Sequence, residues 1–487
     1  MVVKIRKIHL VIIQPLGYAH SLGFIDQARF FRYQFRRLGY EVTIGKNRPR
    51  FDAVNFIFGA HLLFDSGLLD RYKCVIVNLE QLGLGGAQVS ESYLNMLKSF
   101  SVVDYDYENT VVYSDEGRGG VPIISFAHAP YLDRGESALA SRPVDILFFG
   151  SMNDRRKEMI EKVESSGFKV SFLDFGVYGP ERDIHIGSAK AVFNCHFYDL
   201  ARFEQARVFQ CLSLGTPVIS ECSGLSKPPA QFKESVFWVS SEDITRFFRE
   251  YFNTPEFFSS AEEKLEGFKK VDVLDEFSNA LTCLEGVFSQ KNGEGFWMPT
   301  ELHIGSGKDY MLGWLNVDIL ETAQPDLLLD LSKNVDFPVR AVSPIVGSVE
   351  LGGGQLDVIY ANNVLEHVPD LSRLMENCLF LLKDGGKMVI EVPYEHAPTA
   401  WQDPTHVRAL NENSWIYYTD WFWYLGWFEN RFLLEHFAFL DAQLKECSHD
   451  LAHFMQVRFV KIKTSVAEKM VARSMRPDFG GIPNDLV

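Results

Sequence analysis

Short apolar runs alternate along most of this chain with longer stretches in which apolar residues recur at helical spacing. Ile8–Gln14 is mainly apolar and predicts a buried strand, whereas Asp26–Leu38 places its apolar residues on one helix face and stops before Gly39, a residue that favours helix ends. Further buried strands are predicted at Ala53–Phe58, Val75–Asn78 and Val121–Phe126. This alternation favours a parallel sheet covered by helices on both faces.

A second series of the same kind begins at Asp145. Its predicted strands are 146–149, 169–173, 191–194 and 218–221, and its predicted helices are 155–165, 203–214 and several between 241 and 287. The polar, glycine-containing stretch Lys291–Gly295 then predicts a linker.

A third series follows the linker, with predicted strands at 301–304, 314–319, 357–360 and 387–392 and a helix at 372–382. The fold class is therefore α/β, with three Rossmann-like domains in a row. We place the domains at residues 1–135, 136–290 and 296–465, and a C-terminal tail at 466–487.

The composition narrows the class of protein. The chain has 487 residues, of which 46% are hydrophobic and 23% charged, as in globular proteins with substantial cores. Its aromatic fraction of 14% is high and indicates aromatic-lined clefts or thick packing between domains. The net charge of −16 argues against nucleic acid as a partner, because a protein that grips the phosphate backbone needs a basic face.

The cysteines and the apolar runs bear on metals and compartment. The seven cysteines are widely spaced and contain no CxxC pair, so the sequence predicts neither a zinc site nor a disulfide framework. We therefore expect no metal and a reducing, cytoplasmic setting. The apolar run near the N-terminus is too short for a signal peptide, and no stretch of about 18 apolar residues predicts a transmembrane segment. No pattern in the chain indicates the oligomeric state.

Two glycines follow the first strand of the third series. Gly305, Ser306 and Gly307 predict a turn that lets the backbone approach a ligand closely and exposes amides at the start of a helix. The third glycine of the GxGxxG pattern is absent, since Tyr310 stands in its place. Asp318 ends the next predicted strand, where a carboxylate can accept both hydroxyls of a ribose.

Residues 300–463 resemble class I S-adenosylmethionine-dependent methyltransferases, with the closest likeness to small-molecule and sugar methyltransferases of the type 11 kind. Five pieces occur in family order, namely 301–307, Asp318, 329–331, 357–367 and 381–386. The resemblance implies S-adenosylmethionine as cofactor, with Gly305, Ser306 and Gly307 passing the methionine moiety and Asp318 holding the ribose.

The same resemblance extends to the adenine end of the cofactor. It implies that Asp330 and Leu331 flank the adenine and that Asn362 lies at the cofactor edge. An ordinary sheet with turn glycines is the alternative interpretation.

Transfer of a methyl group to a hydroxyl also needs a base, and histidine suits this task near neutral pH. The segment 403–408 is a polar cluster after the fourth strand, and in the resembling family branch it lies over the acceptor. We expect His406 to be the base, oriented by Asp403, with His367 as the second candidate. Supporting hydrogen bonds at His367, and a loop-stabilising network of Asp403 and His406, are the alternatives. Arg408 either grips an anionic acceptor or pairs with Asp403.

Aromatic residues crowd the segment that follows. They are Trp415, Tyr417, Tyr418, Trp421, Phe422, Trp423, Tyr424, Trp427 and Phe428. Such rings stack on the apolar faces of sugars, so the segment is interpreted as an acceptor surface or lid, as plain packing, or as an interfacial membrane contact.

The second series carries a pattern suited to a diphosphate. Its first strand ends at Gly150 and Ser151, and Arg155 and Arg156 open the next helix. Helix N-terminal amides and guanidinium groups together bind phosphates.

Residues 8–287, and most clearly 144–221, resemble GT-B glycosyltransferases, in particular family-1-like and CgeB-like members. The likeness is carried by 146–156, 193–198 and 201–221. It implies a nucleotide-sugar donor as co-substrate, with Gly150, Ser151 and Arg155 at the phosphates. Glu204, the candidate catalytic residue of this half, and Arg207 are expected to contact the donor sugar and diphosphate. His196 and Glu221 are expected to border the pocket.

The chain departs from the pattern of retaining GT-B enzymes, which has two glutamates eight residues apart. Arg202 and Gln210 stand in those two places, which leaves the ribose contact and the stereochemical outcome open. A simple surface pair between Glu204 and Arg207, three residues apart, is the alternative.

In the first series, His20, Glu80 or His128 is a candidate acceptor base, and each is equally well explained as structural. Because GT-B sites use amides and basic side chains to stabilise the leaving group, the expectation of no metal stands for this half too.

Two functional hypotheses follow. The first is a bifunctional enzyme that adds a sugar and O-methylates a glycan, its partner being a lipid-linked or protein-linked glycan or another glycosylated acceptor. Residues 1–135 then form the acceptor-side domain, 136–290 the nucleotide-sugar domain and 296–465 the methyltransferase. The second is a methyltransferase with a non-catalytic GT-B-like binding module, which Gln210 motivates. Nucleic-acid modification is disfavoured by the charge, and a non-catalytic scaffold requires both pockets to be inactive.

Overall fold

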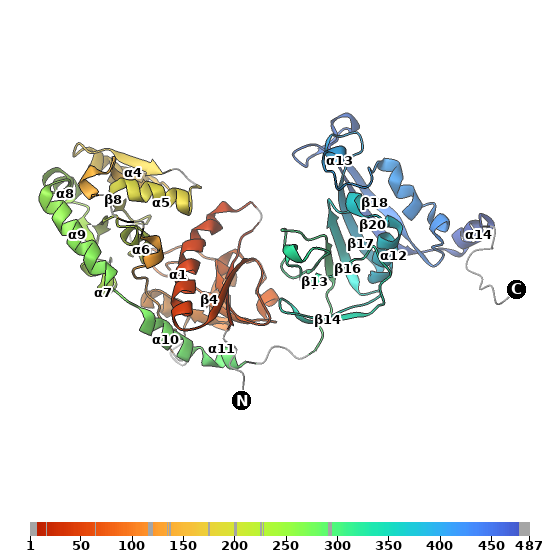
Figure 1. Ribbon diagram of the computed structural model, residues 1–487, viewed down its shortest axis with the longest axis horizontal. Helices are drawn as coiled ribbons and strands as arrows, with labels where there is room; N and C mark the ends of the chain where they lie inside the picture. Colours follow the sequence, from red (N-terminus) through yellow and green to blue (C-terminus); the bar gives the residue numbers. More distant parts are fainter. Residues whose placement is uncertain are drawn as a thin grey trace. The chain divides into compact units, whose positions relative to one another are not determined.

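The computed structural model describes residues 7–476, apart from positions 16, 64, 115–119, 134, 136–137, 174–175, 199–201, 225, 227 and 291–294. The chain divides into two compact units, Met1–Asn292 and Gly293–Val487 (Figure 1). Most of the predicted linker lies outside the described residues. Within the predicted tail, Val466–Ser474 form helix α14, and 477–487 lie outside the described residues.

Five parallel strands form the first sheet of unit 1. They are β1 (Lys7–Ile12), β2 (Glu41–Lys46), β3 (Val54–Phe58), β4 (Lys73–Val77) and β5 (Ser101–Val103), in the order β2-β1-β3-β4-β5. β3 and β4 are buried at every position, as expected for apolar runs in the centre of a parallel sheet. Its helices are α1 (Phe24–Arg37), α2 (Glu91–Ser99) and α3 (Tyr107–Tyr113).

The second sheet of unit 1 repeats this topology. Its parallel strands are β6 (Val144–Phe149), β7 (Val170–Leu173), β8 (Ala189–Asn194), β9 (Val218–Cys222) and β10 (Phe237–Ser240), in the order β10-β9-β8-β6-β7. Its helices are α4 (Asp154–Glu164), α5 (Pro180–Ser188), α6 (Gln205–Ser213), α7 (Ala230–Lys233), α8 (Ile244–Glu250) and α9 (Pro255–Lys269).

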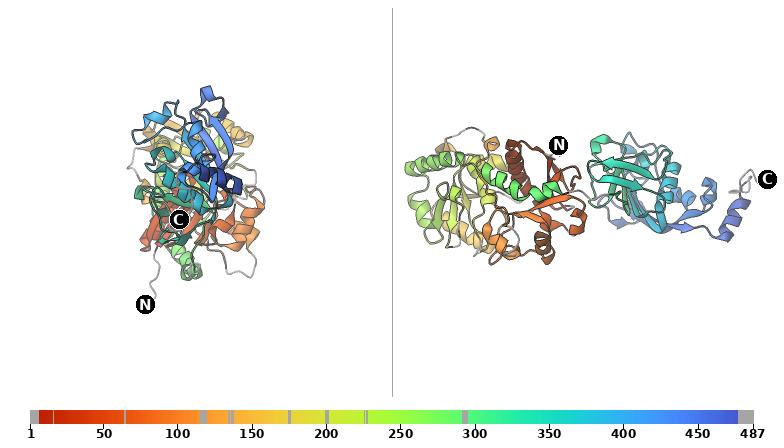
Figure 2. Two further views of the ribbon diagram at one scale, coloured as in Figure 1. Left: turned by 90° about the vertical axis from the view of Figure 1, so that its right-hand side faces the viewer. Right: turned by 90° about the horizontal axis from the view of Figure 1, so that it is seen from below.

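Helices α10 (Leu274–Cys283) and α11 (Glu285–Ser289) return to the first sheet, so the two halves of unit 1 share one core (Figure 1). Phe277 of α10 packs against Phe31 and Phe35 of α1, with ring centroids 5.1 and 5.4 Å apart. Figure 2 shows the same green helices beside the first sheet from another direction. The halves are therefore joined by packing as well as by the chain.

Unit 2 is built on one eight-stranded sheet of order β13-β12-β11-β16-β17-β20-β18-β19. The strands are β11 (Glu301–Ile304), β12 (Leu315–Asp318), β13 (Leu327–Leu328), β16 (Leu356–Asn362), β17 (Leu382–Pro393), β18 (Asn430–Leu440), β19 (Glu446–Cys447) and β20 (Phe454–Lys463). β20 runs antiparallel between β17 and β18. A hairpin of β14 (Val339–Ser343) and β15 (Gly347–Leu351), with helices α12 (Leu371–Leu381), α13 (Thr399–Gln402) and α14, completes the unit.

In each of the three sheets, the order of the parallel strands reverses at one pair of neighbouring strands. The pairs are β1 and β3, β6 and β8, and β11 and β16. Ligands of such sheets bind outside the carboxyl ends of the strands at this point, which lies at Gly150 in the second sheet and at Gly305 in the third. The α/β class with three Rossmann-like sheets is confirmed.

Two local predictions are wrong. Val121–Phe126 forms no strand beyond a single bridge between Asp104 and Ile123, because Pro122 cannot donate a ladder hydrogen bond. No helix follows Gly307, since β11 leads through turns directly to β12. Among the described residues, no helix combines the length and apolar character needed to cross a bilayer.

Candidate active sites

The predicted cofactor turn lies at the switch point of the unit 2 sheet. Gly305 and Gly307 have φ angles of +63° and +48°, in the left-handed region. A Cβ at Gly305 would stand 2.4 Å from a methyl carbon of Val364, so only glycine lets the turn meet the loop after β16 this closely. The turn and that loop therefore form one surface.

Asp318 and Ser306 add polar groups to this surface. The Asp318 carboxylate accepts hydrogen bonds from the amides of Gly307 and Leu320, both at 2.8 Å, and each oxygen retains capacity for a further donor. Ser306 is 1% exposed, and its hydroxyl has no partner among the described residues. A glycine cradle with an unsatisfied buried hydroxyl is an arrangement that a ligand can complete.

The three remaining predicted cofactor residues differ in their settings. Asp330 accepts hydrogen bonds from the amide and hydroxyl of Ser332, at 2.9 and 2.6 Å. Leu331 is buried in the hydrophobic core of unit 2, so its side chain does not face a ligand at the surface. Asn362 ends β16 and is half-buried.

Glu366, His367 and His406 form a cluster beside this surface. One nitrogen or carboxylate oxygen from each lies within 4.8 Å of those from the other two, and the two imidazole centroids are 4.6 Å apart. Glu366 is 2% exposed, and neither carboxylate oxygen has a hydrogen-bond partner among the described residues. Burial raises the pKa of Glu366, against smaller opposing effects of its own amide and the two imidazoles. The cluster thus contains a buried carboxyl group beside two partly exposed histidines.

The orientation of the histidines differs from the prediction. His406 Nδ1 donates to the carbonyl of Ala400 at 2.8 Å, not to Asp403. His367 Nδ1 lies 3.0 Å from the hydroxyl of Thr405, which donates to Asp403 at 2.7 Å. These bonds to Thr405 lower the pKa of Asp403. Asp403 therefore positions His367 through Thr405, while a backbone carbonyl positions His406.

Arg408 holds the loop in place. Its guanidinium group donates to the carbonyls of Val368 and Pro369 at 2.6 and 2.7 Å. The Val407 amide donates to the carbonyl of Glu366 at 2.9 Å. The 403–408 loop is thereby tied to the loop that carries Glu366.

Most of the aromatic segment is packing. Trp415, Tyr418, Phe422, Trp427 and Phe428 belong to the buried core of unit 2. The exposed members are Tyr417, Trp421 and Tyr424, and the ring of Tyr417 lies 5.4 Å from Trp421 and 5.7 Å from Tyr424. The segment therefore supports the sheet from one side and presents a small aromatic patch on the other.

In unit 1, the Gly150 turn is the meeting point of two arginines. A Cβ there would stand 2.8 Å from Arg207 and 3.3 Å from Arg156, and φ is +126°. Arg156 is 3% exposed and donates to the carbonyl of Ser151 at 2.8 Å. Glu204 pairs with both guanidinium groups, at 3.2 Å for Arg156. The predicted pair of Glu204 and Arg207 is thus part of a three-residue group rather than a surface pair.

Three other predicted donor residues are paired away from the turn. Arg155 forms a two-point ion pair with Glu221 and donates to the carbonyl of His196 at 3.0 Å. His196 is fully buried, its Nε2 lies 3.0 Å from Ser226 Oγ, and burial lowers its pKa. Glu221 also accepts from the His196 amide, and burial opposes the bonds that lower its pKa. The three residues therefore form one bonded group that joins the start of α4 to the carboxyl ends of β8 and β9.

A cleft of about 230 Å³ lies between the halves of unit 1. Its walls include Gly150, Ser151 and Arg207 from the second sheet and His20 and Gln27 from the first. An adjoining hollow of about 250 Å³ is bordered by Glu80, Glu204 and Arg207, among others. Of the predicted donor residues, Gly150, Ser151, Glu204 and Arg207 thus border these two hollows, together with the acceptor-side residues His20 and Glu80.

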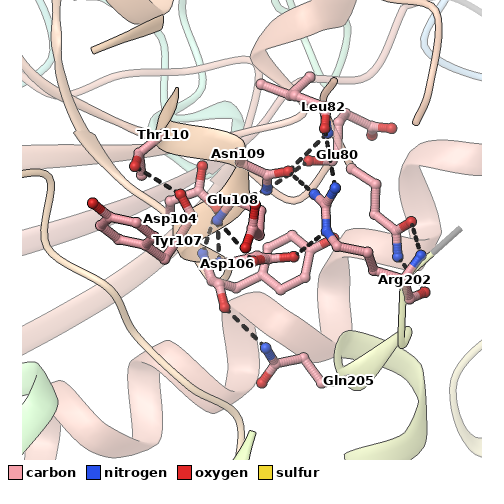
Figure 3. Close-up of polar contacts among 12 residues, drawn as sticks. Glu80, Leu82, Asp104, Asp106, Tyr107, Glu108, Asn109, Thr110, Arg202 and Gln205 are labelled. Atoms are coloured by element: carbon pink, nitrogen blue, oxygen red, sulfur yellow. Dashed lines mark hydrogen bonds and ion pairs between the residues drawn. The ribbon is translucent and has the colours of Figure 1, made fainter. Parts of the chain in front are cut away.

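Polar contacts of the segment 202–207 join the halves beside this cleft. Arg202 donates to Asp106 at 2.5 Å and to the carbonyl of Leu82 at 3.2 Å, and it also bonds Asn109 (Figure 3). Gln205 donates to the carbonyl of Tyr105 at 2.9 Å. Arg202, which stands at the place of the first glutamate of the retaining GT-B pattern, therefore links the two halves of unit 1.

The acceptor-base candidates are not equivalent. His20 lines the cleft, and Glu80 lines the adjoining hollow, where its carboxylate lies 3.6 Å from His61. His128 instead lies against Phe268, with ring centroids 6.3 Å apart, and burial lowers its pKa. His61 is a candidate that the sequence did not indicate.

A family model described as a methyltransferase domain matches residues 184–449, more than half of the 487 residues. The chain belongs to this methyltransferase domain family. The match begins in α5 of unit 1 and extends through most of unit 2, so membership in the methyltransferase domain family confirms the predicted methyltransferase recognition.

Relatives of this family member include proteins of Acanthamoeba polyphaga mimivirus. Uncharacterized protein L140 is 26% identical over 165 residues, covering 31% of this chain and 50% of the relative. Uncharacterized protein L137 is 26% identical over 176 residues, covering 34% and 23%. The chain thus spans half the length of one of these curated relatives and less of the other.

Solved structures similar to this family member fall into two groups. HepE (Alr3699) of Anabaena in complex with UDP and glucose has a TM-score of 0.38 at 13% identity, over 57% of this chain and 99% of that one. An S-adenosylmethionine-dependent methyltransferase of Mesorhizobium loti has a TM-score of 0.23 at 17% identity, over 33% of this chain and 90% of that one.

Two site residues of this methyltransferase-family chain were missed or misassigned from the sequence. Glu366 was seen only as the neighbour of His367, because a glutamate in a loop is normally exposed and its burial depends on the distant 403–408 loop. Arg156, not Arg155, meets the Gly150 turn. Adjacent helix residues face about 100° apart, so helix phase was the one signal that bore on this choice.

Proposed function

We propose that unit 2 transfers a methyl group from S-adenosylmethionine to a hydroxyl of a glycan acceptor, and that the cleft of unit 1 transfers a sugar from a nucleotide-sugar to the same class of acceptor. The observation that carries the first part is the contiguity of two features. The Gly305 turn at the switch point packs closely on Val364, and Glu366 and His367 follow in the same loop, where His406 of the 403–408 loop joins them.

The residues of the turn fit the cofactor. The Gly305 cradle admits close approach, the orphaned Ser306 hydroxyl offers a hydrogen bond, and the Asp318 carboxylate is suited to ribose hydroxyls. When bound, S-adenosylmethionine supplies a methyl group that is already electrophilic. The protein then has to hold the acceptor oxygen in line and exclude water.

The cluster of Glu366, His367 and His406 is positioned to deprotonate the acceptor. Because Nδ1 of His406 donates to a carbonyl, its Nε2 carries the lone pair in the neutral ring and can accept a hydroxyl proton. His367 is the second proton acceptor, fixed through Thr405.

The exposed aromatic patch of Tyr417, Trp421 and Tyr424 supports a glycan as acceptor. Tyr424 is 61% exposed, and rings held edge-on to each other present faces on which the apolar side of a sugar can stack. The patch is suited to the sugar alone, so it is compatible with a glycan carried on a lipid and with one carried on a protein.

For sugar transfer, the supporting observation is the Gly150 turn with Arg156 and Arg207. Two guanidinium groups against one carboxylate, Glu204, leave one net positive charge beside a glycine that permits close approach. Such a site is suited to the diphosphate of a nucleotide-sugar and to stabilising the charge of the departing nucleotide.

A methyltransferase with a non-catalytic binding module is the second candidate. Gln210 lines the cleft with a buried amide nitrogen that has no partner among the described residues, and a neutral amide can bind a sugar without supporting transfer. This candidate shares the methyl transfer and differs only in unit 1.

The test is thermal unfolding with each ligand alone. S-adenosylhomocysteine should raise the melting temperature of the wild type and of Arg207→Ala, but not of Asp318→Asn. A UDP-, GDP- or dTDP-sugar should raise it for the wild type and for Asp318→Asn, but not for Arg207→Ala. No response to S-adenosylhomocysteine would overturn the proposed methyl transfer, and no response to any nucleotide-sugar would overturn sugar transfer. Binding without release of free nucleotide in the presence of glycan acceptors favours the binding module.

A further inference from the structure

The cluster beside the cofactor turn combines two imidazole rings with a carboxylate that has no hydrogen-bond donor among the described residues. We infer that Glu366, His367 and His406 bind one divalent transition-metal ion of the zinc class, a site of three protein ligands in unit 2. The inference rests on the proposed function only in naming the acceptor as an added ligand. The metal binding itself stands on the geometry of the three side chains.

The hydrogen bonds of the two imidazoles leave a nitrogen of each for a metal. His406 donates its Nδ1 proton to the Ala400 carbonyl, and His367 Nδ1 faces the Thr405 hydroxyl, which is itself turned toward Asp403. A histidine that ligates a metal typically donates its other ring proton to a carbonyl, hydroxyl or carboxylate in this way. The Nε2 atoms are therefore the ligand atoms.

Glu366 supplies the negative charge of the site. It is 2% exposed, and neither carboxylate oxygen has a hydrogen-bond partner among the described residues. An ionised carboxylate in such a place is strongly unfavourable unless a cation lies beside it. A divalent ion provides that cation and satisfies the carboxylate.

The spacing of the three ligand atoms suits a shared ion. They lie within 4.8 Å of one another, while two ligands of a tetrahedral zinc ion, each about 2.1 Å from it, are about 3.4 Å apart. A small contraction of the side chains closes the difference. Two nitrogens and one oxygen favour zinc, cobalt, nickel or iron over magnesium and calcium, which prefer oxygen ligands.

Three protein ligands leave a coordination position open, as in catalytic rather than structural zinc sites. An acceptor hydroxyl or a water oxygen is the ligand suited to that position, since the cluster adjoins the loop that packs on Gly305. The assignment changes the part of His406, which then holds the metal instead of taking the proton directly.

The chain offers a matched control for surface binding. Glu395 and His396 form the same Glu-His dipeptide as Glu366 and His367, with the carboxylate 3.5 Å from the ring, but His396 is exposed. Among the described residues, this pair belongs to no group with a third ligand. A weakly held ion at exposed histidines would therefore respond to the His396→Ala variant.

The experiment uses the full chain after removal of metal with a chelator, followed by titration with zinc chloride by calorimetry. We expect one equivalent to bind to the wild type and to His396→Ala, and at least about tenfold weaker binding in His367→Ala and in His406→Ala. Cobalt chloride should give visible d–d bands without an intense sulfur-to-metal band, which separates this site from the free cysteines. Absence of saturable binding, binding unchanged in both histidine variants, or loss of binding in His396→Ala would each overturn the inference.

Glu366→Gln provides a check that does not depend on the histidines. Because it removes a buried charge, this variant should melt at a higher temperature than the metal-free wild type and should lose the further rise that zinc gives to the wild type. A zinc-induced rise equal to that of the wild type would contradict the site. The response to S-adenosylhomocysteine is measured in the same samples, so failure of metal binding and failure of the proposed methyl transfer are told apart.

Discussion

The close contact between Gly305 and the Val364 side chain at the cofactor turn gives a quantitative prediction for Gly305→Ala. The added Cβ would stand 2.4, 3.3 and 3.4 Å from three carbon atoms of Val364, whereas carbons in contact prefer about 3.5–4.0 Å. Overpacking of this kind costs about 1–3 kcal/mol, and a left-handed alanine adds about 1 kcal/mol. Gly305→Ala should therefore destabilise unit 2 by about 2–4 kcal/mol.

Gly307→Ala is the matched control. Its φ is also positive, but the nearest heavy atom to its Cβ is the Gly305 carbonyl oxygen at 3.9 Å, so it should cost about 1 kcal/mol from backbone conformation alone. The difference between the two variants isolates the contact with Val364. Adding Val364→Ala to Gly305→Ala should recover at least about 1 kcal/mol in a double-mutant cycle.

Urea unfolding followed by tryptophan fluorescence is the assay. Of the eight tryptophans, all except Trp238 lie in unit 2, so the signal reports this unit. Equal destabilisation by Gly305→Ala and Gly307→Ala, or no recovery with Val364→Ala, would refute the packing argument. Calorimetric titration with S-adenosylhomocysteine should show weaker binding to Gly305→Ala than to the wild type.

Further predictions concern the stability of unit 1, measured by circular dichroism in urea with the tryptophan transition of unit 2 as internal reference. Arg202→Ala should cost about 2–4 kcal/mol, because it leaves the carboxylate of Asp106 without its charged donor, and a loss below about 1 kcal/mol would contradict a linking role. Burial lowers the pKa of His9 from its usual 6.5 to about 4, so between these pH values the unfolded chain binds a proton and the native ring stays neutral. Stability should therefore fall as pH falls from about 6.5 to 4, by about 3 kcal/mol in all, and His9→Asn should flatten this profile. Arg182→Met should cost about 3–5 kcal/mol because it removes a buried cation that pairs with the two buried carboxylates Asp26 and Asp183, and the additional change Asp26→Asn should recover part of that loss.

The sequence predicted the central parallel strands of unit 2 but not the antiparallel strands on one side of its sheet. β11 has the predicted bounds, because a short apolar run between polar residues defines a central parallel strand. β18 and β20, which form the antiparallel part of the unit 2 sheet, were not predicted. In β20 the alternating pattern is interrupted at Lys461, which takes an inward position; the residue is buried there and donates to the carbonyl of Leu382. A pairing of this kind is set by tertiary contacts rather than by local periodicity.

At the candidate sites too, the sequence predicted features that local geometry sets and missed those set by contacts between residues far apart in the chain. Gly305 and Asp318 were predicted because a turn glycine and a carboxylate at the end of a strand can be recognised from the local sequence. The pairing of Arg155 with Glu221 joins residues 66 positions apart, and no local pattern indicates that the arginine is already occupied. The sequence therefore could not predict which charged side chains are buried or already paired with an opposite charge.

The segment 202–207 has a consequence for anyone who wishes to redesign the sugar cleft. Arg202 and Gln205 fasten one half of unit 1 to the other, whereas Glu204 and Arg207 face the hollow between them. Within six consecutive residues, fastening and ligand-facing positions alternate. Random mutagenesis of this stretch would mix loss of structure with change of preference. Libraries restricted to positions 204 and 207 would leave the bonds of Arg202 and Gln205 between the halves in place, and they would vary only the ion pairs of Glu204 with Arg156 and Arg207.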